Sequence, residues 1–217
     1  MDPFALRRQA FGAVRILLEK SLQVSVKELL QKAFALYEGK DTQQAEAELE
    51  NFFFQRLALL LEQRGHAAGT LAAVNAWDEM PLCDVETLVG VLEKERGGAH
   101  FNAAAEAAKR VCNILKKAEA APQTVQEKLL QLPAEKALFH AVQKAHQALA
   151  ALPQQAGQEA FYKQTLEILA GFAAPLAQFF TDVMVNAEDP SVRANRLALL
   201  SQVKKLLTQG LADISQL

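Results

Sequence analysis

Residues 133–152, PAEKALFHAVQKAHQALAAL, decide the fold class of this chain. Proline stands at the first position, where a helix has no partner for an amide and the missing donor costs nothing. Lys136, Gln143 and Gln147 fall on one side of the helix that these residues would form. The other side is an apolar stripe with intervals of three and four, made of Leu138, Ala141, Val142, Ala145, Leu149 and Leu152. The stretch therefore predicts an amphipathic helix that packs against neighbours in a bundle.

The same spacing recurs along all 217 residues, and no segment alternates with a period of two. Glycine (10) and proline (7) are scarce, which favours long helices with short connections. We predict an all-α helical bundle in which Asp2, Asp41, Asp84 and Asp189 act as helix caps. The expected helices are 3–20, 25–38, 41–65, 67–76, 84–96, 101–120, 122–131, 133–152, 158–170, 175–185 and 190–209.

Gly97-Gly98 is the strongest internal boundary, because paired glycines end a helix and favour a change of direction. It predicts a helical subdomain over residues 1–96 and a second helical bundle over residues 97–217.

Composition limits the function. Hydrophobic residues make up 51% and charged residues 22%, as in a folded protein, and the net charge is −2. Nucleic acid binding would therefore need a local basic patch. Cys83 and Cys112 form no metal or disulfide motif, no signal peptide precedes Arg7 and Arg8, and no segment is apolar enough to cross a bilayer. We expect a cytoplasmic protein.

No catalytic or metal-binding constellation is evident. His66, His100, His140 and His146 are scattered, and the last two would lie about 120° apart on a helix. Metalloprotease, phosphate-loop and nucleophile-elbow motifs do not occur. We expect no catalytic residues, no metal site and no cofactor in this chain.

The most informative segment is residues 107–117, AAKRVCNILKK. On a helix, one face would be apolar, and the opposite arc of about 120° would hold four cations and one amide. These residues are Lys109, Arg110, Asn113, Lys116 and Lys117. Such a patch can bind RNA phosphates, and Asn113 can read a base edge. A solvated lysine-rich face would have the same pattern.

A second basic segment follows Asp189. Arg196 projects into an apolar face and must be paired, because an unpaired buried charge is costly. Asp182, Asp189 or carbonyl groups at a helix end are the candidate partners. Arg193 and Lys204 lie at the rim and are the better RNA contacts. We therefore treat Arg196 and Asp189 as structural.

Aromatic residues leave several alternatives open. The run Phe52-Phe53-Phe54 would span about 200° of one helix, so either the helix is buried on two sides or one ring faces a partner protein. Trp77 is expected to wedge between helices rather than to stack on a base. Phe101, beside the basic helix, is a weaker candidate for base stacking.

Several of these segments resemble the β chain of the two-subunit bacterial glycyl-tRNA synthetase. Residues 108–115, AKRVCNIL, are similar to a KRVxNIL stretch of that family, and residues 2–8, DPFALRR, to the entry into its C-terminal region. Residues 179–185, 192–200 (VRANRLALL) and 212–215 resemble its end. Residues 189–193 also resemble the DALR signature of an anticodon-binding bundle, with the two middle letters altered.

The resemblance implies an all-α DALR-type anticodon-binding bundle preceded by a helical subdomain. It implies a role in ATP-dependent glycylation of glycine tRNA by an α/β enzyme, with ATP and glycine bound by the α chain. The expected partners are glycine tRNA, the α chain and the rest of the β chain. Binding to DNA or to a membrane is not expected. The alternative is a helical scaffold that docks on the rest of the synthetase.

Overall fold

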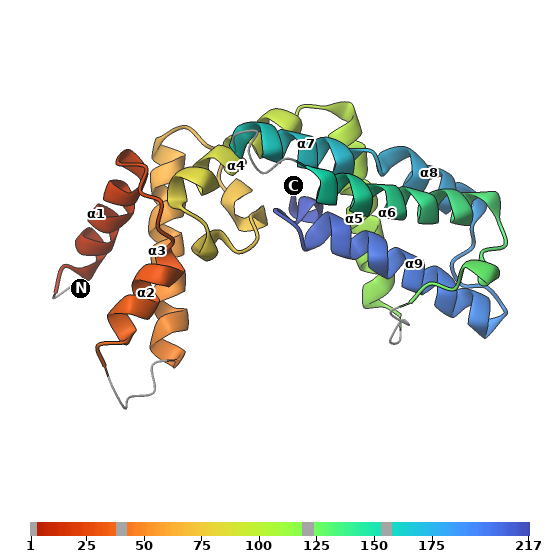
Figure 1. Ribbon diagram of the computed structural model, residues 1–217, viewed down its shortest axis with the longest axis horizontal. Coiled ribbons are helices and arrows are strands. Elements are labelled where there is room, and N and C mark those ends of the chain that lie inside the picture. Colours follow the sequence, from red (N-terminus) through yellow and green to blue (C-terminus); the bar gives the residue numbers. More distant parts are fainter. Residues whose placement is uncertain (1–3, 38–42, 119–123, 153–157) are drawn as a thin grey trace. The chain divides into compact units, whose positions relative to one another are not determined.

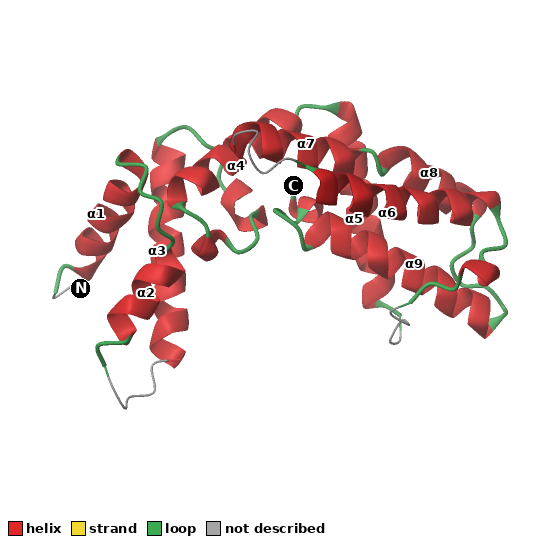
Figure 2. Cartoon of the chain, viewed as in Figure 1, coloured by secondary structure: helices red, strands yellow, loops and turns green. Residues whose placement is uncertain are grey.

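The computed structural model describes residues 4–37, 43–118, 124–152 and 158–217, and all regular structure in these ranges is helical apart from an isolated bridge between Ser25 and Pro81 (Figures 1 and 2). The all-α prediction is confirmed. The chain divides into two compact units, residues 1–93 and residues 94–217, which we call the N-terminal and C-terminal units. The predicted boundary after residue 96 falls at the end of helix α4 (Leu82–Glu95).

The N-terminal unit is built around α3 (Gln43–Gln63). Both α1 (Leu6–Glu19) and α2 (Val26–Phe34) pack against it, and α2 also contacts the 3₁₀ turn η2 (Trp77–Glu79). Helix α2 begins where the Ser25 side chain accepts a hydrogen bond from the amide of Glu28. The core of this unit includes the fully buried Val14, Leu57, Leu82, Leu88 and Leu92.

The C-terminal unit contains α5 (Ala99–Lys116), η3 (Glu127–Leu129), α6 (Pro133–Ala151), α7 (Gln158–Ala170), α8 (Ala173–Asp182), α9 (Pro190–Thr208) and η4 (Ile214–Gln216). Helix α5 packs against α7, α8, α9 and η4, and α6 packs against α7, α8 and α9. In Figure 1, α6 and α9 run alongside each other and α5 crosses them. The core between these helices includes Leu138, Leu166, Phe172, Phe179 and Leu199.

The stripe that predicted α6 faces this core. Leu138, Val142 and Ala145 are buried, and Ala141 and Leu149 are half-buried. The expectation for α9 is also confirmed, because the Asp189 carboxylate accepts hydrogen bonds from the amides of Ser191 (2.7 Å) and Val192 (3.3 Å).

Three predicted elements differ. Residues 67–76 form only the 3₁₀ turn η1 (Thr70–Ala73), because Gly69 before it is left-handed (φ 89°) and Val74 after it is extended (φ −76°, ψ 117°). Within the described part of residues 122–131, only η3 is helical. Helix α4 begins at Leu82, so Asp84 lies within its first turn rather than at its cap. Asp2, Asp41 and Pro122 lie outside the described residues.

Candidate nucleic-acid interface

The outer face of α5 carries the predicted basic patch. Lys109, Arg110, Asn113, Lys116 and Lys117 are all exposed. The opposite face is buried against the bundle through Phe101, Ala104, Ala105, Ala108 and Val111. The division into a cationic outer face and an apolar inner face follows directly from the helical period.

In the described part of the chain, no acid forms an ion pair with the lysines of this patch. Lys109, Lys116 and Lys117 form no ion pair with any residue in the described ranges. The Arg110 guanidinium lies 4.1 Å from the centroid of the Phe180 ring, which orients it without removing its charge. Among the described residues, the patch therefore presents positive charge to solvent without an acidic partner.

Charge is divided unevenly between the two units. The C-terminal unit has fourteen lysines and arginines against eleven acidic residues, whereas the N-terminal unit has nine against fourteen. Although the whole chain has a net charge of −2, the C-terminal unit is therefore net positive. This is the local excess that binding to phosphates requires.

Helix α9 contributes two further cations. Arg193 is exposed in the first turn, and Lys204 is half-buried eleven residues later. Eleven residues complete about three turns, so both lie on the same side of the helix, about 16 Å apart along its axis. Neither side chain pairs with an acid among the described residues. Helices α5 and α9 pack against each other, but a shared cradle of Lys109 and Arg193 stays a prediction.

Arg196 is structural, as predicted, but its acidic partner is a different residue. Its side chain is buried, and its Nε donates to Oε1 of Glu135 at 2.5 Å while Nη1 donates to the carbonyl of Met184 at 2.8 Å. Neither Asp182 nor Asp189 is the partner. Asp182 accepts from Gln178, and Asp189 caps α9. The carbonyl contact just beyond α8 fits the expectation of a helix-end partner.

Glu135 is fully buried and links three segments. Its second oxygen accepts from the amides of Gln131 (2.6 Å) and Leu132 (2.7 Å) at the start of α6. Both carboxylate oxygens are therefore satisfied, and the ion pair joins α6, α9 and the segment after α8. A buried charge pair is stable only when its remaining hydrogen-bonding capacity is filled in this way.

Asn195 has a structural role that we did not predict from the sequence. Its side chain is buried, its Oδ1 accepts from the amide of Gln126 at 2.7 Å, and its Nδ2 donates to the Gln126 carbonyl at 3.1 Å. This two-bond contact holds the connection before α6 against α9. The sequence does indicate this role. Asn195 lies on the helix face that also carries Arg196, and a buried amide side chain needs hydrogen-bond partners.

The aromatic residues also have structural roles. Phe101 is only 2% exposed, so the proposal that it stacks on a base is wrong. Trp77 packs edge-on against Phe54 with ring centroids 5.4 Å apart, as expected of a wedge between elements. Phe52, Phe53 and Phe54 are each half-buried, so the run is neither fully enclosed nor simply exposed.

Residues 104–214 match the family model described as the DALR anticodon binding domain. The chain belongs to this DALR family. The match begins on α5 and ends in η4, so both basic helices lie inside the DALR bundle. In the altered signature, Asp189 caps α9, Val192 is buried and Arg193 is exposed.

Further matches confirm the resemblance to glycyl-tRNA synthetase β chains. Residues 1–76 match the family model of the glycyl-tRNA synthetase beta subunit. The glycine–tRNA ligase beta subunit of Dechloromonas aromatica (strain RCB) is 41% identical over 222 residues, and that of Haemophilus influenzae (strain PittEE) is 39% identical over 217 residues. These alignments cover the whole chain but only 30% and 31% of the relatives, so the chain spans about a third of their length.

The DALR bundle and the preceding unit offer no metal cluster among the residues described, and Cys83 and Cys112 are both free thiols. Burial raises the pKa of the Cys83 thiol, and the nearby Asp84 carboxylate raises it further. The thiol is therefore a poor nucleophile at neutral pH. None of the described helices has the length and apolarity needed to span a bilayer.

Proposed function

We propose that the C-terminal unit binds the anticodon arm of glycine tRNA and thereby supports glycylation by a complete α/β synthetase. In this proposal, the protein works in the cytoplasm, and ATP and glycine bind the α chain. The observation that carries it is the exposed, unneutralised face of α5 inside a DALR bundle. Lys109, Arg110, Lys116 and Arg193 contact phosphates, and Lys117 and Lys204 extend the positive surface.

The roles of the buried residues support this assignment by exclusion. Arg196 and Asn195 are committed to contacts within the bundle, and Phe101 is buried. The exposed cations of the patch and Asn113, by contrast, are accessible to a ligand. An anticodon loop is single-stranded, so its bases are open to an amide group that reads their edges.

A binding titration tests the phosphate contacts. Fluorescence anisotropy with labelled glycine tRNA at several salt concentrations gives the slope of log K against log salt. Lys109→Gln or Lys116→Gln should weaken binding and reduce the slope by about 0.7 to 0.9, as expected for one lost phosphate contact. Lys136→Gln on α6 removes an equally exposed charge outside the patch and should leave the slope unchanged. Equal effects of all three substitutions would contradict the assignment.

A second titration tests base reading. Glycine tRNA and the same tRNA with a substituted anticodon should bind the unaltered chain with different affinities. Asn113→Ala should reduce that difference while the salt slope stays constant, because an amide contacts a base without neutralising a phosphate. If the unaltered chain bound both tRNAs with equal affinity, the proposal that it recognises the anticodon would be contradicted.

A second candidate function is docking on the rest of a synthetase. The exposed apolar surface of the N-terminal unit favours it. Eight of the nine large hydrophobic side chains that are exposed in the described ranges lie between residues 4 and 59. A groove of about 540 Å³ between α1 and α3 is lined by Leu6, Ala10, Leu49, Phe52 and Phe53, among others. Exposed apolar surface of this kind marks protein interfaces.

Calorimetry can test docking with two separate polypeptides. One is the part of the Dechloromonas aromatica β chain that this chain does not match, and the other is the α chain. Leu6→Gln in the groove should weaken binding to one of them, whereas Leu36→Gln, an exposed leucine that does not line the groove, should have less effect. Equal binding by both variants would contradict docking through the groove.

A further inference from the structure

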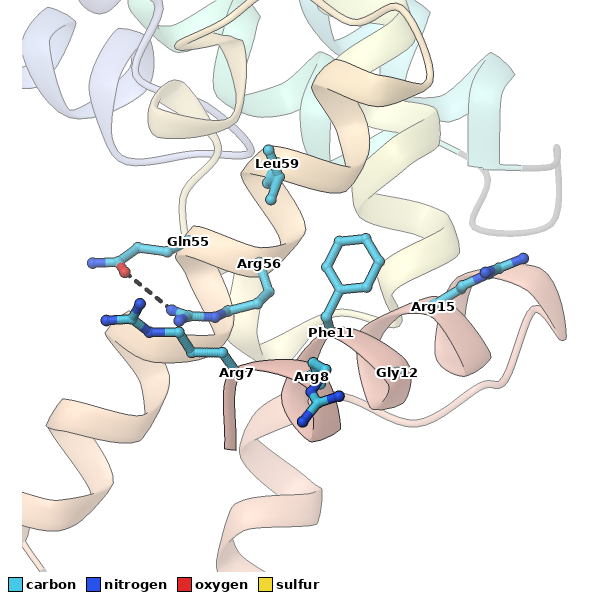
Figure 3. A pocket seen from close by; sticks show the side chains of 8 residues that line it. All are labelled: Arg7, Arg8, Phe11, Gly12, Arg15, Gln55, Arg56 and Leu59. Atoms are coloured by element: carbon cyan, nitrogen blue, oxygen red, sulfur yellow. Dashed lines mark hydrogen bonds between the residues drawn. The ribbon is translucent and has the colours of Figure 1, made fainter. Parts of the chain in front are cut away.

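A second concentration of positive charge lies in the N-terminal unit, outside the DALR bundle. A pocket of about 690 Å³ opens between α1 and α3 (Figure 3). Four arginines line it, together with Phe11, Gly12, Gln55 and Leu59, and no acidic residue does. The arginines are Arg7, Arg8, Arg15 and Arg56. They are four of only nine cations in a unit with fourteen acids, so average composition does not account for their grouping.

Arg8, Arg15 and Arg56 retain their capacity to bind anions. Arg8 is exposed and makes no hydrogen bond or ion pair with any described residue. Arg56 donates to the Phe52 carbonyl and to Gln55 Oε1, both at 3.0 Å, and its guanidinium lies 3.6 Å from the Phe52 ring centroid. These contacts fix its orientation without an acid. Arg15 pairs with Glu19 at 2.6 Å, but both are solvent-exposed, and an exposed pair of this kind exchanges partners at little cost.

The spacing favours a polymeric anion over a single ion. Arg8 and Arg15 are seven residues apart on α1, which is about two turns or 10 Å along the axis. One phosphate cannot contact both, whereas successive phosphates of a strand can. In Figure 3 the side chains of Arg7 and Arg56 lie near each other, whereas those of Arg8 and Arg15 point in other directions.

An aromatic ring lies between these charges. Phe11 follows Arg8 by three residues and precedes Arg15 by four, and Figure 3 shows its half-buried ring pointing from α1 toward α3. A cationic groove with an aromatic side chain is the arrangement that binds single-stranded nucleic acid, because unpaired bases can stack on the ring. In a duplex, the faces of the bases are covered by their neighbours.

The geometry points to a second RNA-binding site in this pocket, which takes an unpaired stretch of RNA. Arg7, Arg8, Arg15 and Arg56 contact its phosphates, and Phe11 stacks on a base. The site lies in a different unit from the DALR bundle and is independent of anticodon recognition.

Gly12 supplies a sharp test, because a side chain added there meets nothing within 4 Å and should enter the pocket without a clash. Gly12→Glu places a negative charge among the arginines, and Gly12→Gln adds the same bulk without charge. Arg8→Gln removes one cation from the pocket, and Lys20→Gln removes one just after α1, outside it. Thermal unfolding of each full-length variant verifies that it is folded.

Binding of a labelled, unstructured twelve-nucleotide RNA and of an RNA duplex is measured in the full chain. Every variant also carries Lys109→Gln and Lys116→Gln, which reduces the contribution of the DALR bundle. Arg8→Gln should lower the single-strand salt slope by about 0.7, and Gly12→Glu should weaken binding more than Gly12→Gln. Phe11→Leu should weaken single-strand binding at least about fivefold and leave duplex binding unchanged. Photocrosslinks from 4-thiouridine should map to residues 8–15.

Two results would overturn the inference. One is equal RNA affinity of Gly12→Glu and Gly12→Gln, with crosslinks confined to residues 104–214. The other is an RNA affinity that does not change in Arg8→Gln while binding of a polyglutamate peptide falls, which would assign the pocket to an acidic protein segment.

Discussion

At the scale of single residues, the two arginines three positions apart on α9 have opposite roles. Arg196 is buried, and both of its described contacts are internal. Arg193 is exposed, and its side chain pairs with no acid among the described residues. The helical period separates them, because three residues turn a side chain by about 300°. Charge type alone therefore does not identify the RNA contacts of this helix.

Arg196→Ala should lower the free energy of unfolding by about 3 to 5 kcal/mol, because it leaves Glu135 as an unpaired buried charge. Arg193→Ala should change it by less than about 0.5 kcal/mol and should weaken tRNA binding. Urea denaturation and tRNA titration measure the two quantities. The paired change Glu135→Gln with Arg196→Met should destabilise less than Arg196→Ala, since it removes both charges and keeps a side-chain oxygen for the amides of Gln131 and Leu132. The reverse pattern for Arg193 and Arg196 would refute this division of roles.

At the scale of elements, the connection between α5 and α6 is held by side chains rather than by regular structure. In its described part, it contains a single 3₁₀ turn. Asn195 of α9 fixes Gln126 through both backbone groups, and Glu135 fixes the amides of Gln131 and Leu132. The Asn195 bonds attach the connection to the helix that carries Arg193. The position of the connection therefore depends on α9.

Asn195→Ala should release this connection. It removes two hydrogen bonds from a buried position and leaves the Gln126 amide without its partner, which costs about 1 to 3 kcal/mol of stability. Hydrogen exchange should accelerate at Gln126, while the amides of the α7 interior keep their protection. Thr208→Ala, which removes a bond between a side chain and the Lys204 carbonyl within α9, serves as the control. An unchanged exchange rate at Gln126 would show that other contacts hold the connection.

At the scale of the whole molecule, the chain has two compact units with different surfaces. The N-terminal unit carries most of the exposed large hydrophobic side chains and the arginine pocket, and its net charge is negative. The C-terminal unit is net positive and carries the DALR match. Each unit has its own buried core, so we expect local changes in stability to remain largely within one unit.

Leu57→Ala in the N-terminal core should lower the free energy of unfolding by about 2 to 5 kcal/mol, because it leaves a cavity at a fully buried position. Hydrogen exchange should accelerate in α1 and α3, while protection in α9 should stay nearly constant. Leu199→Ala, fully buried in the C-terminal core, should give the opposite pattern. Faster exchange throughout the chain in both variants would mean that the two units unfold as one.

The all-α class, the bounds of α6 and α7, the cap at Asp189 and the two faces of α5 could all be predicted from the amino-acid sequence. These features depend on residues within a few turns of each other, where the period of the helix fixes which side chains share a face. The resemblance to synthetase β chains also came from ordered local motifs.

Contacts between groups that are distant in the chain could not be predicted in this way. Glu135 reaches Arg196 from 61 residues away, and Asn195 reaches Gln126 from 69 residues away. The four arginines of the N-terminal pocket come from two helices. The extended Val74 likewise ended η1 in a segment where propensity favoured a longer helix. Such outcomes depend on packing between elements, and no short window of sequence contains both partners.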